Sequence, residues 1–561
     1  MAGFENRRRD DRVSRRHIAV PLAAIVTLGL VPALLYLASF IVLTYPLIRR
    51  FSTHLFADPW DGVVFYWDLW WVNKAVTELH ESPWHTFYLN YPFGVSLLRH
   101  TLHPFNGFLA IPLLRVLTLL HAYNLLVILS FTACGVTTFL LAYHVTRAYW
   151  PSLLAGYVVT FSSYHFAHMD GHQNLVSLQW VPLFVLCWYI LMVRPRIITA
   201  VAAGLVLFAT MLCDYYYFLY GILTGLIIAI WHGLHTKNLG FFLRRTHLPS
   251  LTVFLGVVLA TSGPLVIALL RLHTADPIIG HDPTRNSMDA LAPFIPGPHW
   301  RFANLTRAYW GSLPGDGNEN SVYLGWAVIA LLFYVWRRRP AVPSIGLWYF
   351  IFFSFGLLAL GPVLHVRGVE YPFIKLPYAI LETVFPPIRA SGVAVRMMIM
   401  STLAASVLCA VGLAQASRGS RWERVFAAIV ILALVFEYLP KPRVVTLLRT
   451  PDFVRILKAQ PGSGAVLDTV SDPFRIMYYQ TVHEKPMALA FSVLSRTPHS
   501  VAVQGEELEQ LLENGEYSTL RDGYGIRYLV TDAAKDVDGE HGSVKILFAD
   551  SRVTLYELRP E

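Results

Sequence analysis

Long apolar runs, separated by short polar stretches, fill the chain up to residue 442. The first run follows an Arg-rich start and lacks a small-residue cleavage site, which predicts a signal anchor and not a cleaved signal peptide. A helix that crosses a bilayer needs about 20 residues. On this basis the predicted spans are 18–46, 121–143, 152–166, 174–193, 197–213, 215–233, 249–271, 322–336, 345–364, 394–415 and 423–440. The stretch 104–120 is either a re-entrant piece or a further span, so we expect about 11 to 13 transmembrane helices.

Basic residues gather at the ends of these runs and predict the topology. Arginines that flank a span stay in the cytoplasm, so the basic tail 1–17 is placed there. Residues 18–442 then form a transmembrane domain, and an odd number of spans puts the end of the chain on the opposite side. The segments predicted outside the cytoplasm are the loops 50–103, 272–321 and 365–393 and the tail 443–561. We therefore expect a multi-pass protein of the plasma (inner) membrane.

The tail 443–561 has the pattern of a small soluble α/β domain. Residues 451–459 and 505–515 have helical periodicity, and strands are predicted at 464–470, 526–532, 545–550 and 552–558. The polar residues of the tail either hold this domain together, contact the membrane part or meet an acceptor; they are Gln480, His483 and Arg496.

Composition agrees with a membrane protein. Of the 561 residues, 55% are hydrophobic and 14% are charged, whereas a soluble domain carries about 25% charged residues. These values exclude a soluble cytoplasmic enzyme, a disordered chain and a disulfide-stapled secreted domain. The net charge of +9 is a common sign of nucleic-acid binding, but the basic residues lie at the ends of apolar runs. We therefore expect no nucleic-acid partner.

The first outer loop carries the most chemistry. Asp58 and Asp61 flank a Pro-Trp pair, and Asp68 follows about two helical turns later. The tryptophans around them predict that this segment lies flat on the membrane surface. A carboxylate there could accept a proton from an attacking hydroxyl or bind a divalent cation, Mg or Mn, that grips a phosphate. Alternatively, Asp58 only caps a helix that starts at Pro59.

A second polar segment follows the span 152–166 and carries His168, Asp170 and His172. Two histidines and an aspartate are a possible metal site, but the Asp-Gly pair favours a turn between the histidines. A hydrogen-bonded cluster that lines a cavity is the better expectation, because polar groups at a membrane edge are costly unless they serve one.

The remaining candidates are two acids and two cations on the outer side. Asp289 and Glu319 lie in the loop 272–321, where acids are also commonly just solvated, and Arg389 and Arg396 flank the start of a late span. The two arginines break the positive-inside pattern, and they either bind a phosphate or only snorkel to the interface. The sequence has no P-loop and no dinucleotide-binding fingerprint. Any energy for chemistry must therefore come with a pre-activated membrane substrate.

These features together resemble the GT-C superfamily of membrane glycosyltransferases, and most closely its multi-spanning bacterial members. The stretches that carry the resemblance are ADPWDGVVFYWDLWW, YPFGVSLLRHTLHP, FAHMDGHQNL, SMDALAPFIPGPHW with ENSVYLGW, LALGPVLHV, PPIRASGVAVRM and MYYQTVHEKPMALAFSVLSR. The resemblance implies a polytopic α-helical GT-C-like fold. It also implies transfer of a sugar from a polyprenyl-phosphate carrier to an extracytoplasmic glycan, lipid or protein, with Asp58 and Asp61 as base or metal ligands. Their D-x-x-D spacing departs from the adjacent or D-x-D acids of the family.

The working hypothesis is an inverting attack with Asp58 as base, Asp61 as second acid and Arg389 or Arg396 at the phosphate. The residues expected to bind substrate are His168, Asp170, His172, Asp289, Arg389 and Arg396. Two alternatives stay open: a flippase or transporter of lipid-linked sugars, and a non-catalytic protein of envelope-polymer assembly. A transporter would be expected to show internal repeats, and the sequence shows none.

Overall fold

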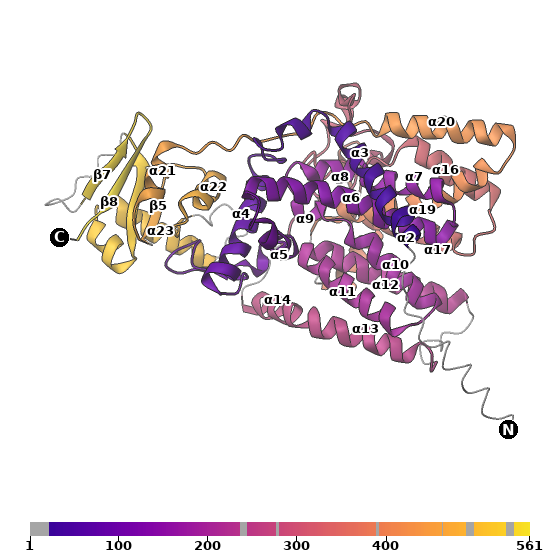
Figure 1. Cartoon of the computed structure of the whole chain (residues 1–561), viewed down its shortest axis with the longest axis horizontal. Helices are drawn as coiled ribbons and strands as arrows, with labels where there is room; N and C mark the ends of the chain where they lie inside the picture. The colour runs from indigo at the N-terminus through magenta and orange to yellow at the C-terminus, as the bar shows by residue number, and fades with distance from the viewer. Residues whose placement is uncertain are drawn as a thin grey trace.

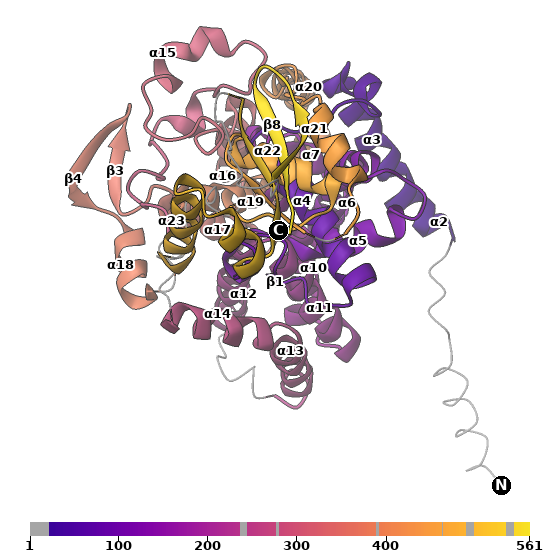
Figure 2. The ribbon, with the colours of Figure 1, turned by 90° about the vertical axis from the view of Figure 1, so that its left-hand side faces the viewer.

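The computed structural model describes residues 22–235, 244–275, 280–386, 388, 392–462, 464–489, 499–533 and 544–560. Helices form a broad bundle, and a smaller domain with a sheet lies at one end of the long axis (Figure 1). Viewed along that axis, the smaller domain lies in front of the bundle (Figure 2). The hairpin of β3 (Val363–Val366) and β4 (Val369–Lys375) projects at the side of the bundle.

The first half of the chain is mainly helical. The first apolar run forms α2 (Leu22–Ile25), a π turn (Val26–Leu30) and α3 (Val31–Thr44) in succession. The next elements are α4 (Asp61–Lys74), a π turn (Ala75–Leu79), β1 (His85–Thr86), β2 (Val95–Ser96), α5 (Pro104–Leu113), α6 (Leu119–Thr146), α7 (Tyr149–Thr160), α8 (Ser163–Met169), α9 (Gln173–Val176), α10 (Trp180–Val193), α11 (Ile197–Cys213), α12 (Tyr215–His235), α13 (Leu248–Thr261) and α14 (Gly263–Ala275). Short 3₁₀ helices cover Leu47–Arg50 and Leu97–Arg99.

The second half begins with the irregular second outer loop. That loop holds 3₁₀ helices at Ala292–Phe294 and Ala303–Thr306 and the short α15 (Arg307–Trp310). It is followed by α16 (Trp326–Arg338), α17 (Ile345–Ala359), β3, β4, α18 (Pro377–Val384), a 3₁₀ turn (Ala394–Met397), α19 (Met398–Ser417) and α20 (Arg421–Glu437). The tail adds α21 (Asp452–Ala459), β5 (Ala465–Asp468), α22 (Pro473–His483), α23 (His499–Glu513), a π turn (Thr519–Gly523), β6 (Ile526–Asp532), β7 (Val544–Ala549) and β8 (Val553–Leu558).

Every predicted span overlaps a helix of the structure. Among the described residues, four helices are long and apolar enough to cross a membrane, or five if α13 and α14, which meet at a bend of 50°, form one span. The four are Leu22–Thr44, Leu119–Thr146, Tyr215–His235 and Ala394–Ser417. Shorter apolar helices cover Pro104–Leu113, Trp180–Val193, Ile197–Cys213 and Ile345–Ala359. The chain is therefore an integral membrane protein with an α-helical fold, while the number of spans and the side of each terminus stay predictions.

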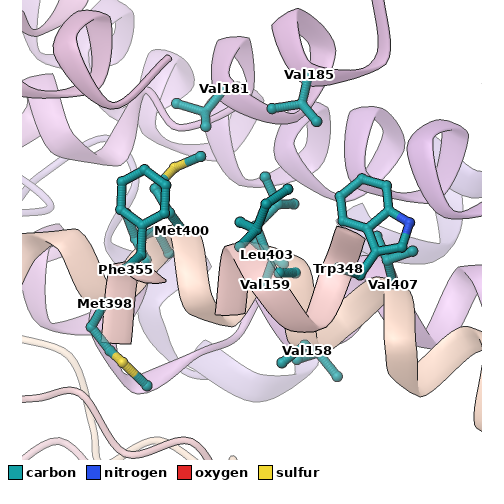
Figure 3. Close-up of a cluster of buried hydrophobic side chains, with 14 of the residues drawn as sticks. Val158, Val159, Val181, Val185, Trp348, Phe355, Met398, Met400, Leu403 and Val407 are labelled. Atoms are coloured by element: carbon teal, nitrogen blue, oxygen red, sulfur yellow. The ribbon is translucent and has the colours of Figure 1, made fainter. Parts of the chain in front are cut away.

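Helix α19 lies at the centre of the bundle. Its residues from Met398 to Leu413 are all buried, as expected of a helix that is apolar on every side. Leu403 and Val407 belong to one cluster with Val159 of α7 and Trp348 of α17 (Figure 3). This packing fixes the start of α19, and with it Arg396, against the outer loops.

The tail forms a four-stranded sheet in the order β5-β6-β8-β7. β5 pairs with β6 in parallel, and β8 pairs antiparallel with both β6 and β7. The strands occupy the segments in which the sequence predicts them. A parallel neighbour requires a crossover connection, which the chain between β5 and β6 provides with α22 and α23.

Helix α4 joins the tail to the bundle. Trp67 and Trp71 are fully buried, with their rings stacked at 5.8 Å between centroids, and they share a cluster with Met477 of α22 and Tyr528 of β6. The expectation that these aromatic rings face the lipid headgroups is therefore wrong for Trp67 and Trp71, and the position of the segment relative to the membrane stays a prediction. These two tryptophans fill the contact between α4 and the tail.

Candidate active site

A cavity of about 540 Å³ lies where the first outer loop, the segment after α8, the second outer loop and the start of α19 meet. Its wall includes the aliphatic Val64 and the aromatic Phe65 of α4, together with several ionisable groups. The lining residues are Asp61, Val64, Phe65, Arg99, His100, Thr101, His172, Asn174, Tyr216, His281, Asp282, Arg285, Asn286, Gly315, Asp316, Glu319, Val393 and Arg396. Four of the candidates from the sequence thus share one cavity: Asp61, His172, Glu319 and Arg396.

Asp58 shapes the loop next to this cavity. Its Oδ1 accepts hydrogen bonds from the backbone N–H groups of Trp60 (3.0 Å) and Gly62 (2.9 Å), so it caps the first turn of α4 from outside the helix. The alternative interpretation places the helix start at Pro59, whereas α4 begins at Asp61 with Trp60 as its N-cap residue.

The N–H of Asp58 donates to the carbonyl of Asp170. A Cβ atom on Gly171 would lie 2.7 Å from Asp58 Oδ2, so the glycine permits the close approach of the two loops. Burial raises the pKa of Asp58 to about 6, although both capping N–H groups act against the shift.

Asp61 begins a chain of ionisable groups along the cavity. Its side chain is 54% exposed, and its Oδ2 lies 3.5 Å from His172 Nε2. The Nδ1 atoms of His172 and His168 are 3.5 Å apart, and His168 Nε2 lies 3.9 Å from Glu319 Oε2. Burial lowers the pKa of His168 well below its ordinary value, which Glu319 only partly offsets. His168 is therefore a neutral link between the exposed Asp61–His172 pair and a buried carboxylate.

Glu319 and Arg396 form a buried ion pair at the far end of this chain. Arg396 Nε donates to both carboxylate oxygens at 3.0–3.1 Å, and its Nη2 donates to Oε1. The guanidinium also lies over the ring of Tyr216, 4.7 Å from its centroid. Burial alone would raise the pKa of Glu319, but Arg396 outweighs it and holds the pKa below the ordinary value. Both groups are held ionised at the cavity wall, and the pair as a whole is neutral.

Two other selected residues hold structure together next to the site. Asp170 is buried, with its carboxylate 3.5 Å from Arg443 Nη1 and 3.5 Å from His299 Nδ1. Asp289 accepts hydrogen bonds from Tyr309 Oη (2.8 Å) and the N–H of Gly368 (2.9 Å). Neither carboxylate lines the cavity. Arg389 and the tail residue Arg496 lie outside the described residues.

The cavity offers few ligands to a divalent cation. Within the described ranges, no three His, Cys, Asp or Glu side chains are grouped closely enough to hold a metal ion. Asp61 and His172 are only two such side chains, 3.5 Å apart, and Asp58 Oδ1 already accepts the hydrogen bonds at the start of α4. The described residues therefore do not fit the cation that the sequence suggests, and no step of the reaction below is routed through it.

Comparison with known proteins places the chain in a family. A family model described as a domain of unknown function (DUF6311) matches residues 75–436, well over half of the chain. The chain belongs to this family. The DUF6311 match contains His172, Glu319 and Arg396 and begins after Asp61. No curated protein matches the sequence.

Solved structures show which fold the DUF6311 chain has. Arabinofuranosyltransferase AftD from Mycobacteria is similar with a TM-score of 0.53 at 13% identity, over 94% of this chain and 40% of that one. Oligosaccharyltransferase AglB from Archaeoglobus fulgidus gives 0.43 at 12% identity, over 90% and 69%. ArnT from Cupriavidus metallidurans gives 0.40 at 12% identity, over 93% and 97%. The first match confirms the resemblance to GT-C membrane glycosyltransferases at the level of the fold, and the DUF6311 chain spans 40% of that protein's length.

Several cavity residues of this DUF6311 protein do not stand out in its sequence. Arg99 and His100 lie within the stretch YPFGVSLLRHTLHP, and Arg285 lies in the second outer loop, which also holds the predicted candidate Glu319. One signal was available for the arginines: they stand on loops predicted outside the cytoplasm, where the positive-inside rule makes basic residues unexpected. The role of Glu319 depends on its pairing with Arg396, which no local pattern predicts.

Proposed function

We propose that this protein is a membrane glycosyltransferase that moves a sugar from a polyprenyl-phosphate carrier to an extracytoplasmic glycan, lipid or protein. The observation that carries the proposal is the meeting of Asp61, His172 and Arg396 at one cavity, although they come from distant parts of the sequence. The fold shared with an arabinofuranosyltransferase supports it.

In the proposed reaction, an acceptor hydroxyl oxygen attacks the anomeric carbon from the side opposite the phosphate. The bond between that carbon and the phosphate oxygen breaks, and its electron pair leaves with polyprenyl phosphate. The hydroxyl proton passes to the carboxylate of Asp61, with His172 beside it. Asp61 is preferred to Asp58 as the base because its side chain is exposed at the cavity, whereas Asp58 caps α4. The product has inverted stereochemistry at the anomeric carbon.

The leaving phosphate needs positive charge near it. Arg285 and Arg396 line the cavity that Asp61 faces, and guanidinium groups bind phosphate oxygens with two parallel hydrogen bonds. Glu319 engages Nε and Nη2 of Arg396, so its Nη1 group is the part of the fork outside that pair. A fixed cation of this kind stabilises charge that develops as the carbon–oxygen bond breaks. Arg389 stays a prediction for the same role.

The test is transfer by the purified full-length protein in lipid vesicles. The donors are polyprenyl-phosphate mannose, glucose, galactose and arabinofuranose, with membrane lipid and glycan extracts as acceptors, and the readout is released polyprenyl phosphate. Asp61→Asn should lower kcat by about 10²–10⁴-fold, which is the usual contribution of a general base. Asp452→Asn is the matched control, because Asp452 is an exposed acid of the tail that does not line the cavity.

Two results would contradict the proposal. Movement of the sugar lipid between leaflets without transfer or hydrolysis would favour a transporter. Full activity of Asp61→Asn together with loss of activity in Asp58→Asn would return the role of base to Asp58, as the sequence hypothesis assigns it.

A further inference from the structure

A buried polar cluster next to the cavity takes no part in the reaction above. It consists of Asp68 of α4 and two histidines of the same outer loop, His100 and His103. The Asp68 side chain is 0% exposed, its Oδ1 lies 2.7 Å from His100 Nε2, and its Oδ2 lies 3.3 Å from His103 Nδ1. A carboxylate without solvent is costly unless it is paired, so both histidines are needed to keep Asp68 inside the protein.

The protonation of His103 follows from its neighbours. Gln173 Nε2 points at the carbonyl of Tyr123 (3.5 Å), which turns Gln173 Oε1 towards His103 Nε2 at 3.0 Å. An amide oxygen only accepts, so this ring nitrogen carries a hydrogen. The other ring nitrogen faces the Asp68 carboxylate, which also only accepts. His103 Nδ1 and Asp68 Oδ2 are in close contact, but neither atom has a hydrogen-bond partner among the described residues. The left-handed backbone of His103, with a φ of 39°, is a strained conformation that holds the ring between the two acceptors.

The protonation of His100 follows in turn. Its Nε2 donates to Asp68 Oδ1, because a carboxylate offers only lone pairs. A neutral imidazole with its hydrogen on Nε2 keeps a lone pair on Nδ1. His100 lines the same cavity as Asp61 and Arg285, although its side chain is only 1% exposed, and Nδ1 is the ring nitrogen that the contact with Asp68 does not use.

We infer that His100 Nδ1 accepts a hydrogen bond from a hydroxyl of the sugar, and that Asp68 is the positioning residue that fixes this tautomer. The phosphodiester of the sugar lipid cannot take this place, because its oxygens offer only lone pairs, and the bare phosphate monoester is a dianion without a hydrogen to donate when the pH is well above its second pKa of about 6. Sugar hydroxyls are the donors that a polyprenyl-phosphate sugar brings into the cavity. The inference rests on the proposed function and adds to it the residue that distinguishes a sugar-bearing lipid from the bare lipid phosphate.

The test compares the binding of two lipids to the full-length protein in detergent. The probes are polyprenyl-phosphate mannose, glucose, galactose and arabinofuranose, each measured against polyprenyl phosphate without a sugar. His100→Gln keeps an N–H group near the Nε2 position and removes the acceptor at Nδ1. It should weaken the binding of the tightest sugar lipid about tenfold, the effect of one lost hydrogen bond, and leave the binding of bare polyprenyl phosphate unchanged.

Two further variants complete the design. His100→Asn retains an acceptor near the Nδ1 position and should recover part of the sugar-dependent affinity that His100→Gln loses. His85→Gln is the matched control, because His85 is an exposed histidine of the same outer loop that does not line the cavity. Thermal unfolding identifies any variant that fails to fold, and the two substitutions at His100 leave different contacts intact.

Each result decides between the possibilities. Wild-type affinity of His100→Gln for the sugar lipid would overturn this inference and leave the proposed function standing. Equal losses for both lipids would assign His100 a purely structural role and would also overturn it. If the wild-type protein bound neither lipid, the proposed function would fall together with the inference.

Discussion

The two faces of helix α4 serve different purposes. One face carries Asp61 and Phe65 to the cavity, where the carboxylate is half exposed and meets a histidine. The other face carries Trp67 and Trp71 into a contact with the tail, where both rings are fully buried. Helix α4 thus forms part of the cavity wall with one face and packs against the tail with the other. We call the face with Trp67 and Trp71 the sealed face and the face with Asp61 and Phe65 the open face. Substitutions on the sealed face should therefore lower the stability of the protein, and substitutions on the open face should lower its activity.

Polar groups on the two faces differ in the same way. On the sealed face, Trp67 Nε1 donates to Gln480 Oε1 at 2.7 Å, and Gln480 Nε2 donates to the carbonyls of Tyr88 (2.6 Å) and Lys485 (3.0 Å). Gln480, a polar tail residue selected from the sequence, thus fastens the tail to the outer loop. On the open face, the exposed carboxylate of Asp61 is available to a substrate. A buried polar group needs a hydrogen-bond partner within the protein, whereas a polar group that lines a cavity can form hydrogen bonds with water or with a ligand.

The largest effect is expected from the sealed face. Trp67→Ala removes a fully buried ring from the contact between α4 and the tail, and it leaves Gln480 without its donor. The free energy of unfolding should fall by about 3–5 kcal/mol, as for other large core truncations. Urea unfolding followed by tryptophan fluorescence measures this loss. Trp60→Ala is the matched control, since Trp60 is 55% exposed, and an equal loss in both variants would contradict the comparison.

A smaller effect is expected from Gln480. Gln480→Leu leaves the Trp67 N–H buried without an acceptor, which should cost about 1–3 kcal/mol. Replacing Trp67 by Phe in the same chain removes the donor as well, so the double variant should be more stable than the sum of the two single changes predicts. Strict additivity in urea unfolding would show that the hydrogen bond does not hold the two parts together.

The helices of the bundle could be predicted because apolar length and charge position are local properties of a sequence. The tail strands could be predicted for the same reason, since alternation is visible over a few residues. The role of Trp67 could not be predicted, because a tryptophan suits a membrane interface and a protein core equally well. Only the docking of α22 on α4 decides between them.

Several residues of the candidate site could be predicted from the sequence, but the contacts between them could not. Asp61 and His172 stand out as polar residues in outer segments, and the structure brings them to 3.5 Å. The ion pair of Glu319 and Arg396, in contrast, joins residues 77 positions apart, and the spacing of charges along a chain does not indicate such a contact. In the sequence, Asp68 stands out only as an acid that follows Asp61. The contacts of Asp68 with His100 and His103 depend on the path of the intervening loop, which the sequence does not show.

The smallest effect is expected from titration of Asp58, at the border between the two faces. Burial raises the pKa of its carboxyl to about 6, above the ordinary value near 4. The folded state then binds the proton more tightly than the unfolded state. The resulting stabilisation is present below the unfolded pKa and is lost as the pH rises through about 6.

Asp58→Asn cannot titrate, yet its amide oxygen can still accept from the N–H groups of Trp60 and Gly62. Between pH 4 and pH 7 the wild-type protein should therefore lose about 1–2 kcal/mol of stability relative to this variant. Thermal or urea unfolding at closely spaced pH values measures the difference, and Asp452→Asn provides an exposed control. If the stability difference between the wild-type protein and Asp58→Asn stayed constant with pH, the Asp58 carboxyl would be as well solvated as that of Asp61. Asp58 would then belong to the open face of α4 and not to the border between the two faces.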